Sequence, residues 1–271
     1  NQAPDFGGID IDDPTSDIHL DFTGWNKGLF GYVEGGSVSN LHLENDTIVG
    51  AVAIGGIVAI NVGGTISHCS MTGFVGSVES GPCGGIVGLN TDGIVEHCTA
   101  NATSKGTRSA GVLVGTSTGA RAVIRDSHAQ GKCHVTQYRA GGFCGSQFDG
   151  SLIERCWANV EVSNAAYKYA AMDCAGFVAN NDGTIRECYS MGAVTSPKSA
   201  AGFVASNVGR IESCYCTGNV TVGGWGCTAA AFVGENGNGS VSYGEVVGDF
   251  PGVTINCFAT GRCSGSDDQA G

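Results

Sequence analysis

The sequence predicts an all-β fold, a right-handed parallel β-solenoid of about eight coils. An imperfect repeat recurs along most of the 271 residues. Glycine is also in excess, at 46 residues, where ordinary usage is about 7%. One repeat is too short to bury a core, so copies stacked in register would share one. The right-handed sense follows from the rule for parallel crossovers.

The repeat is clearest in segments that open with Gly-Gly or Ala-Gly, at residues 55–73, 84–102, 141–160, 175–194 and 201–220. Residues 28–45 and 110–131 are degenerate copies, and an insert near 242–253 interrupts the copy at 230–263. The consensus is G-G-Φ-V-G-x-N-x-G-x-I-x-x-C-x-A-x-G-x-V, in which Φ is apolar. It predicts about three short strands in each coil, with inward and outward positions alternating after the cysteine.

The same pattern divides the chain into three parts. Residues 28–263 hold the repeats, the acidic segment 1–27 is expected to be an N-terminal cap or a linking arm, and 264–271 form a C-terminal tail. Solenoid ends expose unpaired strand edges that must be covered or joined to another chain. An uncovered end would favour head-to-tail stacking of copies.

Charge and hydrophobicity limit the class of protein. The net charge is −12, and the 13 Lys and Arg residues are spread thinly along the chain. We therefore expect no basic patch that could bind nucleic acid. The sequence also has no apolar run long enough to insert into a membrane. Hydrophobic residues make up 42% of the chain, which argues against disorder.

The repeat resembles the GLUG motif. The matching residues are Gly85-Ile86-Val87-Gly88, Gly202-Phe203-Val204 and the run from Cys214 to Val220, and the resemblance covers roughly residues 55–263. GLUG repeats occur in bacterial surface proteins, including filamentous-haemagglutinin-like adhesins and some immunoglobulin-A-specific peptidases. The resemblance implies an architecture rather than an activity. Those peptidases act through a separate metal-binding domain, and this chain has no H-E-x-x-H motif.

Equivalent positions of stacked coils form columns about 4.8 Å apart. One inward column is a structural core ladder made of Cys69, Cys98, Cys156, Cys188, Cys214 and Cys257. A second is a structural amide ladder made of Asn61, Asn90, Asn181, Asn207 and Asn236, with Gln147 in the same column. Stacked amides can hydrogen-bond along the axis and satisfy turn backbone. Better disulfide candidates lie outside the first column, at Cys83, Cys133, Cys144, Cys174, Cys227 and Cys263.

The residue after each column cysteine is expected to point outward. In the C-terminal half these residues form an aromatic strip, which consists of Trp157, Tyr189, Tyr215 and Phe258. Contiguous exposed aromatics mark binding sites, and flat rings suit sugar faces or a protein partner. The alternative is that a loop covers the strip or that it only stacks on itself.

Another column alternates in charge, with Glu96, Arg125, Glu154, Arg186 and Glu212 on successive coils. A slip by one coil would bring like charges together, so we interpret this column as a charge ladder that maintains register. His68 and His97 are equivalent and could share a metal ion, but a third ligand is missing, so no metal and no cofactor is predicted.

These features favour a non-catalytic module at the bacterial cell surface or outside the cell. It would bind a glycan or a surface protein, or assemble with copies of itself end to end. The alternative is a carbohydrate-active β-helix enzyme, a polysaccharide lyase or glycoside hydrolase, which needs close carboxylates on one face. Asp126, Asp149, Glu154 and Glu161 are the candidates. The G-x-S-x-G match at residues 115–119 lies in a repeat and is interpreted as chance.

Overall fold

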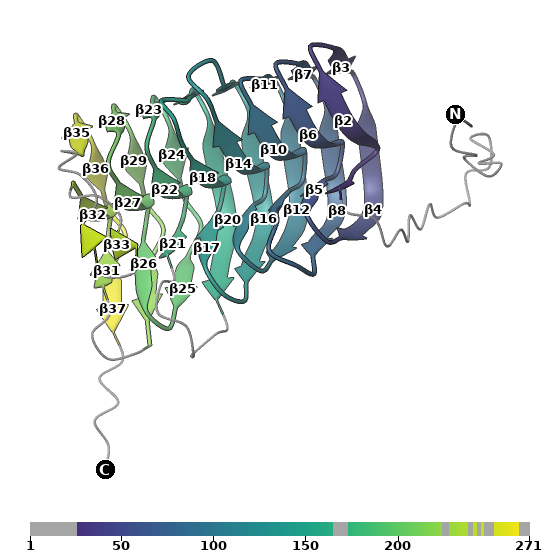
Figure 1. The fold of residues 1–271 in the computed structure, drawn as a ribbon. Coiled ribbons are helices and arrows are strands. Elements are labelled where there is room, and N and C mark those ends of the chain that lie inside the picture. The colour runs from purple at the N-terminus through teal and green to yellow at the C-terminus, as the bar shows by residue number, and fades with distance from the viewer. Residues whose placement is uncertain are drawn as a thin grey trace, which may run out of the picture.

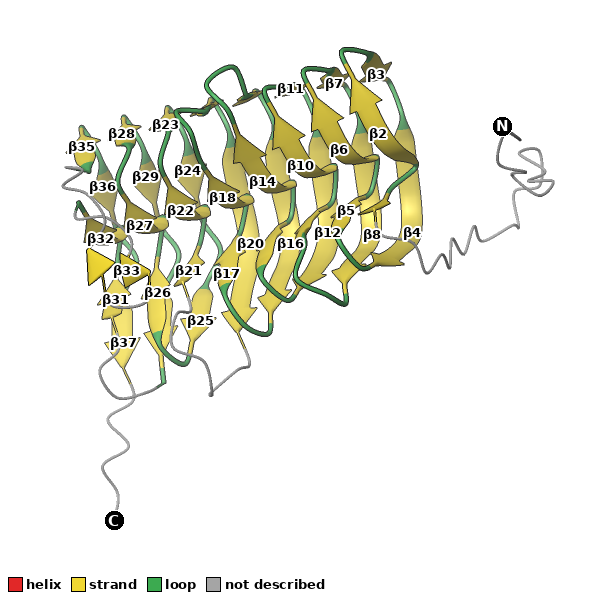
Figure 2. Cartoon of the chain, in the orientation of Figure 1, coloured by secondary structure: helices red, strands yellow, loops and turns green. Residues whose placement is uncertain are grey.

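A computed structural model describes residues 26–164, 173–223, 228–237, 241–242, 245–246 and 252–265. These residues form a right-handed parallel β-solenoid, as the sequence predicts. Figure 1 shows its coils stacked along one axis, from the coil that contains β2 to the coil that contains β35. The described part consists of strands and loops (Figure 2) and holds no helix able to cross a membrane.

Each coil contributes to each of four parallel sheets, numbered here in chain order. Sheet 1 consists of β1 (Asn26–Lys27), β5 (Ala53–Gly55), β9 (Pro82–Gly84), β13 (Ser109–Gly111), β17 (Arg139–Gly141), β21 (Asp173–Ala175), β26 (Ser199–Ala201) and β31 (Thr228–Ala230). Sheet 2 consists of β2 (Phe30–Glu34), β6 (Val58–Val62), β10 (Val87–Thr91), β14 (Val114–Thr118), β18 (Cys144–Gln147), β22 (Val178–Asn181), β27 (Val204–Asn207) and β32 (Val233–Asn236).

Sheet 3 consists of β3 (Ser37–Ser39), β7 (Thr65–Ser67), β11 (Ile94–Glu96), β15 (Val123–Arg125), β19 (Leu152–Glu154), β23 (Thr184–Arg186), β28 (Arg210–Glu212) and β35 (Val253–Ile255). Sheet 4 follows the path β4 (His42–Gly50), β8 (Ser70–Ser77), β12 (Thr99–Gly106), β16 (His128–Val135), β20 (Trp157–Asn164), β24 (Tyr189–Ser190), β29 (Tyr215–Cys216) and β36 (Phe258–Ala259). It also includes β25 (Val194–Ser196), β30 (Val220–Val222) and β37 (Cys263–Gly265).

Within the described residues each of sheets 1 to 3 has eight strands, so the expected number of about eight coils is confirmed. A two-stranded antiparallel pair, β33 (Val241–Ser242) and β34 (Glu245–Val246), lies within the predicted insert. The first coil begins at Asn26 and the last strand ends at Gly265, each two residues beyond the expected repeat boundaries. The predicted cap or arm before residue 26 and the tail after 265 lie outside the described residues.

The expectation of about three strands per coil was wrong, because every coil contributes to four sheets, and each of the last three coils gives sheet 4 two short strands. The additional strand is in sheet 1 and precedes the Gly-Gly or Ala-Gly pair that was taken as the start of the repeat. Its middle residue points into the core, as Cys83, Ala110 and Cys174 do. Chain direction then changes at the glycine. At Gly141 an added Cβ would lie 1.9 Å from the carbonyl oxygen of Cys144, so a side chain does not fit this bend.

One continuous hydrophobic core runs the length of the solenoid. Its largest buried side chains are Phe143, Phe177 and Phe203, whose rings stack on one another at centroid distances of 4.7 and 4.9 Å. Phe232 extends the stack at 5.0 Å. The sequence analysis identified only an apolar position here, so this inner Phe ladder was missed.

The corner between sheets 3 and 4 turns through one residue with a positive φ in each coil. These φ angles lie between 50° and 58°, and the residues are Asn40, His68, His97, Asp126, Arg155, Glu187, Ser213 and Asn256. The left-handed conformation reverses the in-out alternation locally, so that the preceding strand and the following cysteine both face the core. The corner residues themselves lie on the surface.

Candidate functional site

The aromatic strip lies on the outer face of sheet 4. Trp157 in β20 is in register with Tyr189 in β24, Tyr189 with Tyr215 in β29, and Tyr215 with Phe258 in β36. Register alone therefore brings together rings that lie 26 to 43 positions apart in the chain. His128 in β16 is in register with Trp157 and continues the strip by one coil.

The five rings stack face to face. Centroids lie 4.4 Å apart for His128 and Trp157, 6.0 Å for Trp157 and Tyr189, 4.9 Å for Tyr189 and Tyr215, and 5.1 Å for Tyr215 and Phe258. Neighbouring ring planes differ by only 5° to 7°. We call this set, His128 plus the aromatic strip, the outer ring ladder.

Stacking changes what the outer ring ladder can offer to a partner. Each inner ring is covered on both faces by its neighbours, so its flat face is not open to a sugar. The ladder presents ring edges and tyrosine hydroxyls, together with the outer face of Phe258, which is 57% exposed. The other rings are half-buried. Burial, and then the nearby Tyr215, raise the pKa of Tyr189, so the hydroxyl of Tyr189 stays protonated at neutral pH.

Polar side chains lie beside the outer ring ladder on the same face of sheet 4. Two residues beyond the ring positions, and therefore on the same face, are Asn101, Gln130 and Asn159, which are in register with one another. Their amides lie at the surface. A partner that contacts the ring edges would thus meet hydrogen-bonding groups alongside them.

The column cysteines lie inside the solenoid. Five of them are buried and Cys257, in the last coil, is partly buried. Each thiol donates a hydrogen bond to the carbonyl oxygen two residues earlier, at 3.1 to 3.3 Å. These residues are Cys69, Cys98, Cys156, Cys188, Cys214 and Cys257. The ladder fills the core and is not accessible to a ligand.

The cysteines predicted as disulfide candidates are free thiols wherever the structure describes them. Cys83, Cys133, Cys144 and Cys174 are buried, and Cys263 is exposed. Burial raises the pKa of Cys144 and of Cys174 to about 12, which removes thiolate reactivity at neutral pH. Cys227 lies outside the described residues.

The amide ladder is hydrogen-bonded along the axis. Asn61 Nδ2 donates to Asn90 Oδ1 at 2.8 Å, Asn181 to Asn207 at 2.7 Å, and Asn207 to Asn236 at 2.7 Å. All but Asn236 are buried. Ser117 occupies the position between Asn90 and Gln147 and accepts a hydrogen bond from Asn90. The serine of the G-x-S-x-G match is thus a buried ladder member in a strand, away from any strand-to-helix elbow.

The carboxylates proposed for a glycan-active enzyme are engaged by other groups. Arg155 binds Asp126 through two hydrogen bonds of 2.7 and 2.9 Å, and its guanidinium also pairs with Glu154 at 2.9 Å. Arg186 pairs with Glu154, and Lys132 pairs with Glu161 at 3.2 Å. Thr118 donates to Asp149. The hydrogen bond from Arg155 lowers the pKa of Asp126, so this group is not a proton donor at neutral pH.

The charge ladder has the expected register, from Glu96 through Arg125, Glu154 and Arg186 to Glu212. Within it, Arg125 pairs with Glu96 and Arg186 pairs with Glu154. Arg155 adds contacts from the neighbouring corner column, and the sequence analysis did not include it.

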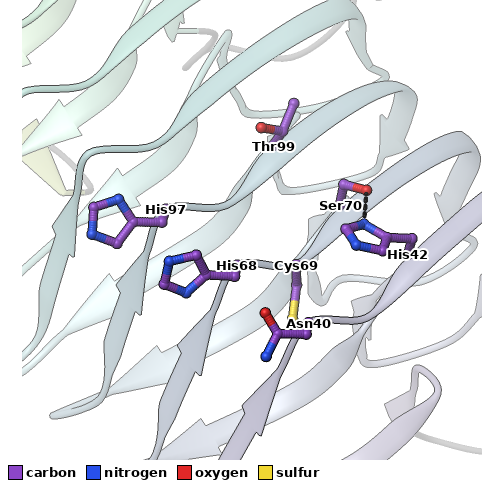
Figure 3. Close-up of a pocket in the computed structure, with 7 residues that line it drawn as sticks. All are labelled: Asn40, His42, His68, Cys69, Ser70, His97 and Thr99. Atoms are coloured by element: carbon purple, nitrogen blue, oxygen red, sulfur yellow. Dashed lines mark hydrogen bonds between the residues drawn. The ribbon is translucent and has the colours of Figure 1, made fainter.

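Figure 3 shows a shallow pocket of about 360 Å³ near the first coils, lined by Asn40, His42, His68, Cys69, Ser70, His97 and Thr99. The rings of His68 and His97 stack at 4.9 Å, and His42 Nδ1 is hydrogen-bonded to Ser70 at 2.7 Å. Within the described residues no three metal-binding side chains converge, here or elsewhere. The pocket therefore offers two imidazoles side by side but no set of ligands for a structural metal.

No protein-family model matches this chain, and no curated protein matches its sequence. Among solved structures, a similar fold occurs in the crystal structure of a candidate immunoglobulin A1 protease from Bacteroides ovatus. The TM-score is 0.52 at 15% sequence identity, over 86% of this chain and 68% of the other. At that identity the likeness concerns the fold alone.

Proposed function

We propose that this chain is a non-catalytic binding module of a bacterial protein exposed at the cell surface or secreted. The observation that carries the proposal is the outer ring ladder, an unbroken row of aromatic edges on the outer face of sheet 4. Aromatic residues that form a contiguous row at the surface, here half-buried except for the exposed Phe258, are a feature of interaction sites. The GLUG-like repeat supports a surface location, and so does a fold neighbour whose named target is an antibody.

A glycan is the partner that this surface suits best. The tyrosine hydroxyls and the amides of Asn101, Gln130 and Asn159 offer hydrogen bonds next to apolar ring edges. Sugars present hydroxyls and apolar C–H groups in alternation, so both kinds of contact would be used. A surface protein is the second partner class.

Assembly of copies end to end has less support. Lys27 lies in β1, the edge strand of sheet 1, and is in register with the core residue Ile54. It is 7% exposed, so its charged side chain occupies an inward column at the edge of the solenoid. Inward-pointing charges on edge strands oppose further strand pairing.

The proposal is tested by screening the purified chain on a glycan array and repeating the screen with Tyr189→Ala/Tyr215→Ala. We expect the double variant to lose binding and to keep its fold, checked by circular dichroism. Tyr32→Ala is the matched control, because Tyr32 is a 56% exposed tyrosine on sheet 2. Binding that survives in the double variant would remove the outer ring ladder as the site.

The carbohydrate-active enzyme is not favoured, since its candidate carboxylates are engaged in ion pairs or hydrogen bonds. It remains testable by incubating the chain with polysaccharides and measuring new reducing ends or unsaturated products. Turnover that disappeared in Asp126→Asn or Glu161→Gln would restore it.

A further inference from the structure

We propose that the turns between sheets 4 and 1 in the third and fourth coils form a second binding site, which takes the carboxylate or sulfate group of an acidic glycan. We call this site the cationic corner. It consists of Lys105 and His134 at the ends of β12 and β16, Arg108 and Tyr138 in the turns that follow, and Arg139 at the start of β17. It rests on the proposed function only for the class of partner, because it lies apart from the outer ring ladder in the fold.

The cations of the cationic corner have no carboxylate within ion-pair distance, which they share with Arg262 among the described residues. Ion pairs engage six of the Lys and Arg residues that the structure describes, namely Arg121, Arg125, Lys132, Arg155, Arg186 and Arg210. Lys105, Arg108 and Arg139 form no ion pair with any described residue. The cations are spread thinly along the sequence, so only the stacking of coils places these three on adjacent turns and strands.

Register explains how the corner assembles. Lys105 is in register with His134, and Ser109, which follows Arg108, is in register with Arg139. The backbone N–H of Arg139 donates to the carbonyl oxygen of Arg108 at 2.7 Å. Residues about one coil apart in the sequence therefore lie on neighbouring strands or turns, which places three cationic residues on adjacent coils. The guanidinium of Arg139 lies over the ring of Phe148, 6.0 Å from its centroid.

The guanidinium of Arg108 lies over the ring of Tyr138, with its central carbon 5.4 Å from the ring centroid. This cation–π contact holds the planar group in place, while its N–H donors stay in the plane and remain open to solvent. Both residues are exposed, Tyr138 by 37%. A guanidinium fixed in this way is suited to bidentate recognition of a carboxylate or sulfate.

Two further titratable groups lie next to the cations of this corner, His134 and Asp173. Burial, and then the positive charge of Lys105, lower the pKa of His134, so its imidazole is neutral at pH 7 and serves as a hydrogen-bonding group. Asp173 is in register with Arg139 on the next coil and partly offsets its charge. Arg108 and Lys105 should therefore contribute most of the binding.

The small extent of the cationic corner argues against a nucleic acid as the partner. Nucleic-acid binders carry a longer basic track, whereas the net charge of this chain is −12. An acidic glycan carries its carboxylates or sulfates on sugars whose hydroxyls can also bond to Tyr138 and His134.

The test is titration calorimetry of the whole chain at about 50 mM salt, where surface charges are weakly screened. The probes are an oligogalacturonate for carboxylate, a heparin-derived oligosaccharide for sulfate, a neutral dextran oligosaccharide and single-stranded DNA. We expect one or both acidic glycans to bind, and Arg108→Ala to weaken binding about tenfold, as loss of a charge-assisted hydrogen bond does. Lys105→Ala/Arg108→Ala should weaken it further.

Arg262→Ala is the matched control, because Arg262 is an exposed arginine in the last coil. Arg108→Lys keeps the charge but not the planar group, so it should bind more weakly than the native chain. Tyr189→Ala/Tyr215→Ala should bind the acidic probes as the native chain does, which separates this site from the outer ring ladder. Equal binding by the native chain and Lys105→Ala/Arg108→Ala, equal binding of dextran, or stronger binding of DNA would each overturn the proposal.

Discussion

The solenoid carries two stacked ring ladders, one inside and one outside, and they have nearly the same geometry. Centroid distances are 4.7 to 5.0 Å for the inner Phe ladder and 4.4 to 6.0 Å for the outer ring ladder. Both spacings follow the separation of neighbouring strands, about 4.8 Å. Stacking is therefore a consequence of register wherever aromatic residues share a column.

What separates the two ladders is exposure. Phe143, Phe177 and Phe203 are completely buried, whereas the outer rings are half-buried or exposed. The inner rings exclude water along their whole surface, so they should stabilise the fold strongly. The outer rings keep water at their edges and should contribute little to stability. A row of large aromatic side chains on this face is therefore better suited to contact with a partner than to stabilising the fold.

The largest effect is expected from Phe177→Ala. Phe177 is stacked between Phe143 and Phe203, and its removal would leave a ring-sized cavity in the core. Such changes destabilise a protein by about 3–5 kcal/mol. Urea unfolding followed by circular dichroism measures the loss. A loss no larger than that for Tyr189→Ala would show that the two ladders do not differ as their burial indicates.

A smaller effect is expected from Asn207→Ala in the amide ladder. Asn207 accepts a hydrogen bond from Asn181 and donates one to Asn236, and it is 1% exposed. Truncation leaves the buried amide of Asn181 with only the carbonyl oxygen of Gly183 as an acceptor, and loss of such a buried hydrogen bond costs about 1–3 kcal/mol. Asn159→Ala on the outer face is the control and should change the free energy of unfolding little. Equal effects would mean that water satisfies the inner amides.

Tyr215→Ala tests whether the outer ring ladder contributes mainly to ligand binding or to the stability of the fold. The side chain lies between Tyr189 and Phe258, so its loss removes two ring contacts of about 0.5–1.5 kcal/mol each. We expect a modest fall in thermal stability together with a clear loss of ligand binding. A large fall in stability with unchanged binding would make the outer ring ladder a structural element.

The smallest effect is expected for the change in folding stability at acid pH. The folded-state pKa of Asp126 is lowered, first by its hydrogen bond with Arg155, and that of Glu154 is also lowered because contacts with Arg186 and Arg155 outweigh the effect of burial. A lowered carboxyl pKa contributes stability above the unfolded value, about 4, which is lost as the pH falls through the folded value.

Chemical unfolding at pH 7 and at pH 3 should therefore show lower stability in acid. In Arg155→Gln this difference should shrink by at most about 1 kcal/mol, because the pairs are partly exposed to solvent. A pH dependence that is the same in Arg155→Gln and in the native chain would exclude Arg155 as its cause.

Much of the architecture could be predicted from the sequence because the same residue types recur at equivalent positions of successive repeats. Cysteine, asparagine and outward aromatic residues recur at constant offsets from the glycines, and the period of two along a strand assigns each to a face. The columns from Cys69 to Cys257 and from Asn61 to Asn236, and the alignment of Trp157 with Tyr189, need no more than this.

Other features could be identified only in the folded chain. The fourth strand of each coil was hidden because its residues vary, as Pro82, Ser109 and Arg139 do at one position. The cationic corner was hidden for the same reason, since Lys105, Arg108 and Arg139 follow no repeat pattern and meet only through the stacking of coils. The faces of the rings in the outer ring ladder are likewise covered only because rings of neighbouring coils stack on them.

The sequence by itself determined the columns, because these depend on spacing within a repeat. Tertiary structure alone decided which side chains touch and which remain open, because that depends on contacts between repeats.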